Sequence, residues 1–130
     1  MARRAFLDTH VALWLARGDS RLTKHILRDI NSHGETVISA ISLAELEIKA
    51  EINKLVLPAN LGELFESNGI KVEAFGAGAS LQLARFPVLA RHDPFDRLIL
   101  AQASARLGTT FFTADETMAG LDLDWIRSCI

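Results

Sequence analysis

The feature that most constrains the fold of this chain is a regular alternation of short apolar runs with stretches of helical periodicity. The runs are rich in β-branched and aromatic residues and predict strands, whereas the stretches between them predict helices. The predicted strands cover residues 4–8, 36–41, 70–75, 109–115 and 123–127. This alternation is typical of an α/β fold, with a central, mainly parallel sheet of about five strands flanked by helices.

The predicted helices fill the intervals between these strands. They cover 9–18, 21–32, 42–55, 61–69, 77–85 and 93–108, with a helical turn at 116–120. In open α/β sheets, ligands bind beyond the carboxyl ends of the strands. The residues that directly follow each strand are therefore the first place to look for a functional site.

Composition narrows the class of protein. With 49% hydrophobic and 23% charged residues, the 130-residue chain is typical of one compact globular domain, 1–130, and not of a disordered chain. A net charge of −2 gives no overall basic field that would attract nucleic acid. A local basic rim is still compatible with this net charge. The single cysteine, Cys129, excludes an intrachain disulfide and favours a reducing compartment.

Targeting and membrane signals are weak. The arginine pair at 3–4 faintly resembles the start of a signal peptide, but Asp8 and His10 interrupt the apolar run that would have to follow. No stretch approaches the roughly 18 apolar residues of a membrane span. We therefore predict a cytoplasmic protein without a membrane segment.

Acidic residues recur at the predicted strand ends. Asp8 ends the first strand, Glu45 lies one turn into the helix after the second, and Asp115 ends the fourth. Asp93 and Asp96 open the helix that precedes this fourth strand. These residues are distant in sequence, but a parallel sheet would bring most of them to one edge.

Each acid taken alone is better explained by helix capping. "SLAE" at 42–45 and "TADE" at 113–116 match the capping-box pattern. The Asp-Pro pair at 93–94 fits an N-cap followed by proline at the first helical position. Asp96 would then lie in the first turn, where an anion gains about 0.3–1 kcal/mol from the helix dipole. Either Asp8 or Thr9 is a candidate cap for the first helix.

Capping does not explain why acids gather at one edge. Serine or asparagine caps a helix as well as aspartate does, and several clustered carboxylates would repel one another unless a cation neutralised them. A hard divalent ion with oxygen ligands, Mg²⁺ or Mn²⁺, is the natural partner. Such an ion can bridge to a phosphate and supply the nucleophile by lowering the pKa of a water. The cluster therefore favours metal-dependent phosphodiester chemistry.

Four blocks of the sequence carry a resemblance to a known family. They are "FLDTHVALWL" (6–15), "SAISLAELEIKAEINKLVLP" (39–58), "HDPFDRLILAQA" (92–103) and "FFTADETM" (111–118). Together and in this order, the blocks resemble the PIN-domain ribonucleases, in particular the VapC-type toxins of bacterial toxin–antitoxin pairs. The resemblance implies a PIN-like fold, as a single PIN domain over 1–130, while the region 60–90 matches only loosely.

The resemblance also implies an acidic pocket that holds Mg²⁺ or Mn²⁺. The family's catalytic and metal-binding acids match Asp8, Glu45, Asp96 and Asp115. Supporting hydroxyl positions match Thr113 and Ser42, and Asp93 matches a position that shapes the start of its helix. The tryptophan often found beside the family's glutamate is replaced by Ala44.

Other residues near these acids have less specific roles. Glu47 would point about 200° away from Glu45 around the helix axis, so Glu45 is preferred. His10 and His92 flank acid positions, and hydrogen bonding to the backbone or to a pocket carboxylate is favoured over metal ligation. Arg97 is as well suited to an RNA phosphate as to a neighbouring acid. The candidate rim cations are Arg3, Arg4, Arg85 and Arg91.

By resemblance, the chain is then a metal-dependent endoribonuclease that cleaves RNA through a metal-activated water. Its partners would be a VapB-like antitoxin, an RNA substrate and a second copy of the toxin. Two alternatives remain open. One is a PIN-like scaffold that binds RNA or a partner without catalysis. The other is a receiver-type phosphoacceptor domain, which lacks support because no lysine follows "LDWI" at 123–126.

Overall fold

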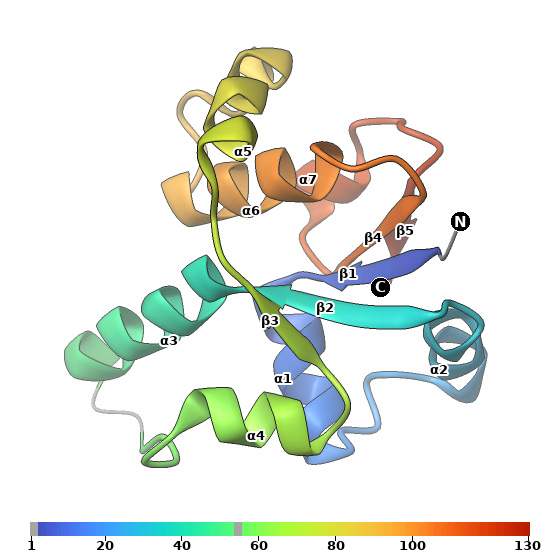
Figure 1. Cartoon of the computed structure of the whole chain (residues 1–130), viewed down its shortest axis with the longest axis vertical. Coiled ribbons are helices and arrows are strands. Elements are labelled where there is room, and N and C mark those ends of the chain that lie inside the picture. Colours follow the sequence, from blue (N-terminus) through green and yellow to red (C-terminus); the bar gives the residue numbers. More distant parts are fainter. Residues whose placement is uncertain (1–2, 54–55) are drawn as a thin grey trace.

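The sheet confirms the predicted architecture. The computed structural model describes residues 3–53 and 56–130, and in these residues the strands form a five-stranded sheet of order β3-β2-β1-β4-β5 (Figure 1). Its strands are β1 (Arg4–Leu7), β2 (Glu35–Ser39), β3 (Lys71–Glu73), β4 (Thr109–Thr113) and β5 (Ile126–Ser128). Every neighbouring pair is parallel. The receiver-type alternative is wrong, because receiver domains have the strand order 2-1-3-4-5.

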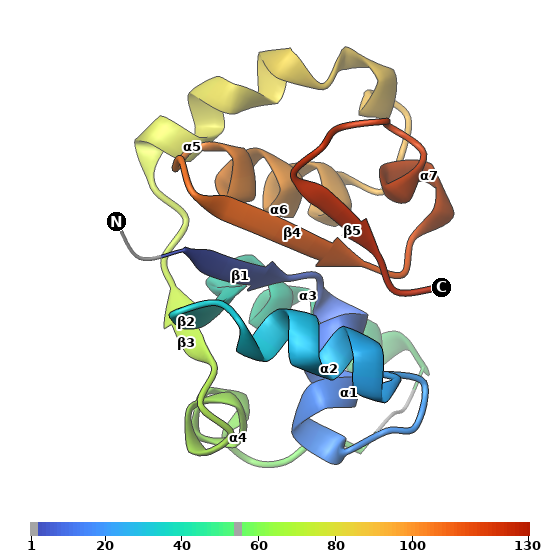
Figure 2. The same cartoon turned by 90° about the vertical axis from the view of Figure 1, so that its right-hand side faces the viewer.

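Helices cover both faces of this sheet. They are α1 (Thr9–Arg17), α2 (Lys24–Asn31), α3 (Ala40–Asn53), α4 (Leu61–Ser67), α5 (Ala77–Leu81), α6 (Pro94–Ser104) and α7 (Glu116–Ala119). Two 3₁₀ turns, η1 (Gln82–Arg85) and η2 (Pro87–Leu89), lie between α5 and α6. Figures 1 and 2 show α1, α2 and α4 on one face and α5, α6 and α7 on the other. None of the helices in the described residues is long and apolar enough to cross a bilayer.

The core follows from the alternation of side chains along the central strand. On β1, Ala5 and Leu7 point into the cluster shared with α1, α2 and α4, whereas Phe6 points into the cluster under α6. All three are fully buried. Because both faces of the central strands are covered, the middle of each strand carries buried apolar residues that face both ways, as expected of a parallel sheet.

Two predicted boundaries are wrong in a way that matters for the site. Strand β2 ends at Ser39 and α3 begins at Ala40, two residues before the predicted start. The Ser39 hydroxyl accepts a hydrogen bond from the Ile41 backbone N–H at 3.0 Å. The segment 42–45 is thus inside the helix and is not its capping box. Residues 54–55 of the predicted helix lie outside the described residues.

The helix predicted for 93–108 is also shorter than expected and ends at Ser104. The Ser104 hydroxyl donates to the Ala101 carbonyl at 2.8 Å, and Gly108 has the positive φ of 77° from which the chain enters β4. Serine bonds of this kind compete with helix continuation. The predicted helix at 77–85 is divided into α5 and η1.

Arg4 was expected at the rim and this expectation is wrong. Its side chain is 1% exposed, lies on β1 and pairs with Glu73 at the end of β3. Gln102 of α6 donates to the same carboxylate at 3.1 Å. Burial alone would raise the pKa of Glu73, but the hydrogen bonds from Arg4 and Gln102, with the charges of Arg4 and Arg106, outweigh it and lower the pKa. This network ties β1, β3 and α6 together.

Candidate active site

Asp8 and Asp115 lie side by side because their strands are parallel neighbours. Asp8 directly follows β1, and Asp115 lies two residues beyond the end of β4. Each also caps a helix: Asp8 accepts from the Thr9 N–H at 2.8 Å, and Asp115 accepts from the Met118 N–H at 2.9 Å. Each capping bond uses one carboxylate oxygen, so capping and a role in a shared site are compatible.

Thr113 connects these two acids. Its hydroxyl donates to Oδ2 of Asp8 at 2.7 Å and accepts from the Asp115 N–H at 3.0 Å. The predicted capping box at 113–116 is therefore wrong, because Asp115 and not Thr113 is the N-cap of α7. Asp8 is 4% exposed, and its burial raises the pKa despite the opposing hydrogen bond from Thr113.

Glu45 reaches the same edge from α3. Glu45 is buried, and its carboxylate accepts from the Thr9 hydroxyl at 2.6 Å. The Ser42 hydroxyl, one turn earlier on α3, lies 2.8 Å from that of Thr9. Glu47 is exposed, as the helical spacing predicted. Thr9 and Ser42 thus hold Glu45 in place from the side of the core.

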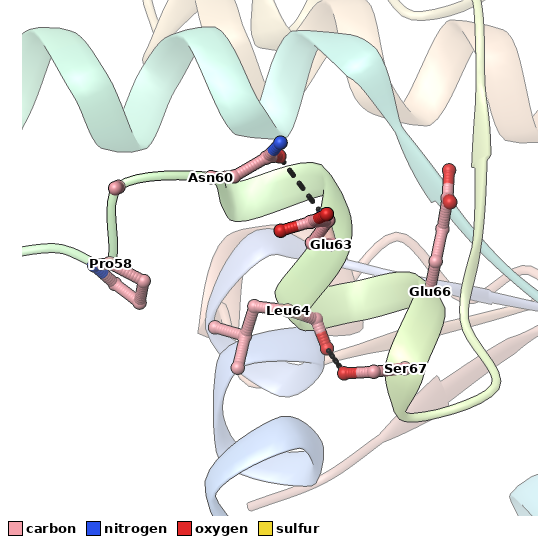
Figure 3. A pocket seen from close by; sticks show the side chains of 7 residues that line it. Pro58, Asn60, Glu63, Leu64, Glu66 and Ser67 are labelled. Atoms are coloured by element: carbon pink, nitrogen blue, oxygen red, sulfur yellow. Dashed lines mark hydrogen bonds between the residues drawn. The ribbon is translucent and has the colours of Figure 1, made fainter.

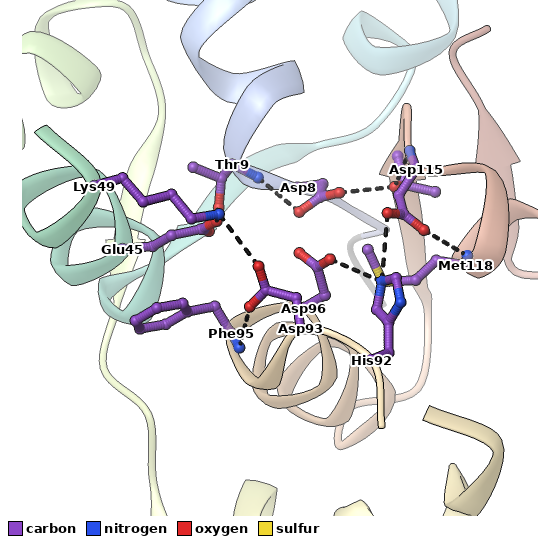
Figure 4. A network of polar contacts seen from close by, with 11 residues as sticks. Asp8, Thr9, Glu45, Lys49, His92, Asp93, Phe95, Asp96, Asp115 and Met118 are labelled. Carbon is purple, nitrogen blue, oxygen red and sulfur yellow. Dashed lines mark hydrogen bonds and ion pairs between the residues drawn. The ribbon is translucent and has the colours of Figure 1, made fainter. Parts of the chain in front are cut away.

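The start of α6 supplies the remaining acids. Asp93 is the predicted N-cap, and its Oδ1 accepts from the Phe95 N–H at 2.9 Å. Asp96 lies in the first turn, 3.0 Å from Nε2 of His92. The same His92 nitrogen is 3.4 Å from Oδ2 of Asp115, so the imidazole joins α6 to the end of β4 (Figure 4).

All four predicted acids line one cavity of about 470 Å³. The lining comprises Asp8, His10, Trp14, Glu45, Lys49, His92, Asp93, Asp96, Ala114 and Asp115. His10 is exposed, with its ring 6.4 Å from that of Trp14 at the pocket surface. Thr113 and Ser42 do not line the cavity: Thr113 contacts Asp8, which does, whereas Ser42 contacts Thr9, which in turn contacts Glu45. The structure therefore brings the acids from four separate segments to one place.

The electrostatics of this cavity centre on Asp96. Burial, followed by the negative charges of Asp8, Asp93, Glu45 and Asp115, raises the pKa of Asp96 to about 7. Uncompensated carboxylates produce such a shift, and a bound cation would reverse it. The pKa of Lys49 is raised as well. Burial alone would lower it, but the contacts of the ammonium with Glu45 and Asp93 outweigh burial.

The donor atoms fit a hard divalent ion. Two groups of side chains place their ligand atoms within 4.8 Å of one another, namely His92–Asp96–Asp115 and Glu45–Asp93–Asp96. Carboxylate oxygens, with one imidazole, are ligands that Mg²⁺ and Mn²⁺ accept. Asp8 lies beside both groups, with each oxygen already accepting one hydrogen bond and able to accept more.

The structure does not bring the two predicted substrate arginines into the cavity. Arg97 is half-buried, and its Nη2 donates to the Leu83 carbonyl at 3.0 Å, on the side of α6 that faces η1. Arg91 is exposed next to His92 but does not belong to the lining. Neither arginine contacts the acids.

Sequence reasoning missed Lys49 and gave too small a role to Thr9. Lys49 donates to Oε2 of Glu45 at 2.6 Å and to Oδ2 of Asp93 at 3.2 Å. The signal was present in the sequence, because a glutamate four residues before a lysine lies on the same helix face. The contact between Thr9 and Glu45 crosses from α1 to α3 and has no such local signal.

A second hollow, of about 620 Å³, lies beside the start of α4 (Figure 3). Its lining comes entirely from the segment 58–67. The polar groups there serve the helix itself: Asn60 accepts from the Glu63 N–H at 3.0 Å, and Ser67 donates to the Leu64 carbonyl at 3.0 Å. The acidic cavity remains the better candidate of the two. Polar side chains from distant segments of the chain line it, whereas a single segment lines the hollow beside α4.

Comparison with known proteins identifies a matching family. The family model described as "PIN domain" matches residues 5–122. No match was found among curated proteins.

Three solved structures share the fold, each over almost the whole of both chains. A chain of the Rickettsia felis VapBC2 structure, which is bound to a promoter DNA fragment, is 16% identical with a TM-score of 0.65, covering 96% of this chain and 98% of that one. A chain of the DNA-bound VapBC structure from Salmonella typhimurium is 21% identical with a TM-score of 0.64, covering 98% of this chain and 99% of that one. A chain of a toxin–antitoxin complex from Klebsiella pneumoniae is 14% identical with a TM-score of 0.65, covering 97% of this chain and 98% of that one.

Proposed function

Because this chain belongs to the PIN domain family, we propose that it is a VapC-type toxin, acting as a metal-dependent endoribonuclease. The observation that carries the proposal is the convergence of four acids on one cavity. Asp8 and Asp115 come from the ends of neighbouring strands, and Glu45 and Asp96 from the facing starts of α3 and α6. The raised pKa of Asp96 is what a site suited to a cation would show when no cation offsets the neighbouring acids.

Asp8, Asp96 and Asp115 hold the ion in this proposal, with Glu45 at the far side of the cavity. Bound Mg²⁺ or Mn²⁺ would lower the pKa of a water and offset charge on the phosphoryl oxygens. The protein's own contribution is placement. Thr113 fixes Asp8, Thr9 fixes Glu45, and these buried hydroxyls hold the carboxylates in one orientation.

His92 has a separate role in the proposal. Its Nε2 lies 3.0 Å from a carboxylate oxygen of Asp96 and 3.4 Å from one of Asp115. The imidazole therefore links these two acids and helps to fix their relative positions.

The substrate we propose is RNA, in single-stranded loops whose backbone can be splayed into the cavity. His10 and Trp14 at the cavity surface offer ring faces to a base, and exposed Arg91 lies close enough in sequence to His92 to meet a neighbouring phosphate. Arg97 is less suited to this role than the sequence suggested, since its guanidinium contacts a backbone carbonyl.

A VapB-like antitoxin is the partner that we propose for the toxin, which would itself be a homodimer. The support is that the three structural relatives come from VapBC or toxin–antitoxin complexes. An antitoxin segment covering the acidic cavity would block RNA directly. If a small reading frame beside the gene encodes this antitoxin, its co-expression should relieve growth arrest caused by the toxin alone.

The decisive experiment is an RNA cleavage assay on the protein purified without antitoxin. We expect cleavage with Mn²⁺ that is lost with EDTA, with Asp8→Ala and with Asp96→Asn. Mn²⁺ should also raise the Tm by several degrees, because saturation at 100 times the Kd adds about 2.7 kcal/mol to the free energy of unfolding. Cleavage that survives both the chelator and the substitutions would reject the proposal. No cleavage and no Tm shift would favour the non-catalytic scaffold.

A further inference from the structure

The acidic cavity contains two overlapping groups of potential ligands. His92, Asp96 and Asp115 form one, and Glu45, Asp93 and Asp96 form the other. Enzymes that cleave phosphodiesters with two metals hold the ions about 3.5–4 Å apart and bridge them with a shared carboxylate. The presence of Asp96 in both groups would suit such a pair, so the donor atoms alone do not set the number of ions.

A side chain of the protein already lies in the second group. The Lys49 ammonium is 2.6 Å from Oε2 of Glu45 and 3.2 Å from Oδ2 of Asp93. It therefore contacts two of the three potential ligands of that group. Figure 4 shows Lys49 reaching from α3 toward the start of α6, on the opposite side of the cavity from His92.

We propose that the Lys49 ammonium takes the place of a second metal ion, so that the cavity binds one divalent ion, held by Asp8, Asp96 and Asp115 on the side where His92 lies. The inference rests on the proposed metal-dependent function and adds the number and place of the ions. A divalent ion between Glu45 and Asp93 would have to displace the ammonium or lie against it. Both alternatives are unfavourable in a partly buried site, where like charges are poorly screened.

The burial of Glu45 distinguishes this contact from an ordinary surface ion pair. Exposed pairs contribute about 0–1 kcal/mol and are easily replaced by water. The Glu45 side chain is 2% exposed, so its charge needs a partner, whereas the Lys71–Glu35 pair is 64% and 30% exposed. Removing Lys49 leaves a buried carboxylate next to Asp93 and Asp96, and this set can accept a metal ion instead.

The test counts bound ions directly. Metal-free full-length protein is titrated with Mn²⁺, and the free ion is measured by its paramagnetic resonance signal. We expect one ion for the wild type and for Lys49→Arg, and two for Lys49→Met. Adding Asp93→Asn to Lys49→Met should return the count to one. Lys71→Met, which removes a lysine from an exposed pair, is the matched control and should bind one ion.

Two ions in the wild type, or an unchanged count of one in folded Lys49→Met, would overturn the inference. If Lys49→Met does not fold, Lys49→Gln replaces it, and the wild-type count alone still decides between one ion and two. RNA cleavage on the same preparations separates this result from the proposed function. One ion without cleavage rejects the nuclease and leaves the role of Lys49; two ions with cleavage reject only the role of Lys49. No bound ion rejects both.

Discussion

The Thr113 hydroxyl donates a 2.7 Å hydrogen bond to the buried carboxylate of Asp8 and so links the carboxyl ends of β4 and β1. Thr113→Val has a similar shape but lacks this donor. We expect the free energy of unfolding to fall by about 1.5–3 kcal/mol, the range for hydrogen bonds to charged groups. Mn²⁺ affinity should fall as well, because the pKa of Asp8, already raised by burial, rises further.

Urea unfolding and Mn²⁺ titration measure these two effects. Thr113→Ser keeps the hydroxyl and should restore most of both. Thr110→Val is the matched control, since Thr110 is a buried threonine of the same strand whose hydroxyl faces His33. It should affect stability without affecting Mn²⁺ affinity. Equal Mn²⁺ affinities for Thr113→Val and the wild type would contradict the role given to Thr113.

Glu45 and Glu47 form a natural pair for comparison, two residues apart on α3, one buried and one exposed. Glu45→Gln should reduce RNA cleavage by at least about 10–100-fold, the range found when groups around a metal site are removed. Glu47→Gln should leave cleavage unchanged, because its side chain faces solvent. Single-turnover rates with saturating Mn²⁺ test this. Similar losses in both variants would mean that helix charge, and not the cavity, controls the rate.

Much of the fold could be predicted because local pattern and tertiary structure agree. Apolar runs bounded by turns located four of the strands, whereas the strand predicted at 123–127 shares only residues 126–127 with β5. Parallel pairing then required the strand-end acids to share an edge. Asp93 shows the same agreement, since Asp-Pro before an apolar helix pattern is a strong local start signal, and it is the N-cap. The predicted helix boundaries were less accurate where two serines a few residues apart could each cap the helix, as Ser39 and Ser42 could at the start of α3.

What could not be predicted lies in contacts between elements. Arg4 is a charged residue within an apolar strand, and only the approach of Glu73 from another strand explains its burial. Arg97 follows Asp96 directly, but the helix turn between successive residues directs it to Leu83 and away from the acids. Lys49 is intermediate: its spacing from Glu45 is local, while its contact with Asp93 depends on how α3 meets α6.

Asp93 and Asp96 should differ in what they support, although both begin the same helix. Asp93→Ala removes the N-cap and should lower the free energy of unfolding by about 1 kcal/mol, whereas Asp93→Asn should retain most of it because asparagine caps equally well. Asp96→Asn should remain folded and lose RNA cleavage. Circular dichroism melts and cleavage assays on all three variants test this. If Asp93→Ala and Asp96→Asn lose stability and activity in the same proportions, the two residues do not have separate roles.

The raised pKa of Asp96 predicts how the stability of the metal-free protein depends on pH. The carboxyl group has a pKa of about 7 in the folded protein against an ordinary value of 3.8, because burial and four neighbouring acids disfavour its charged form. The folded state therefore holds this proton more tightly than the unfolded state does. The stability that the proton contributes is present below about pH 4 and is lost as the pH rises through about 7.

Asp96→Asn lacks this proton and should remove that part of the pH dependence. In EDTA, we expect the variant to be more stable than the wild type above about pH 7, with the difference shrinking or reversing as the pH falls toward 4. With Mn²⁺ the order at high pH should reverse, since the ion stabilises only the charged pocket and its affinity grows as Asp96 loses its proton. Melting temperatures across this pH range, with and without Mn²⁺, measure both effects. Parallel pH profiles for wild type and Asp96→Asn in EDTA would show that Asp96 titrates at its ordinary pKa, and the cavity would then not need a cation to tolerate its charge.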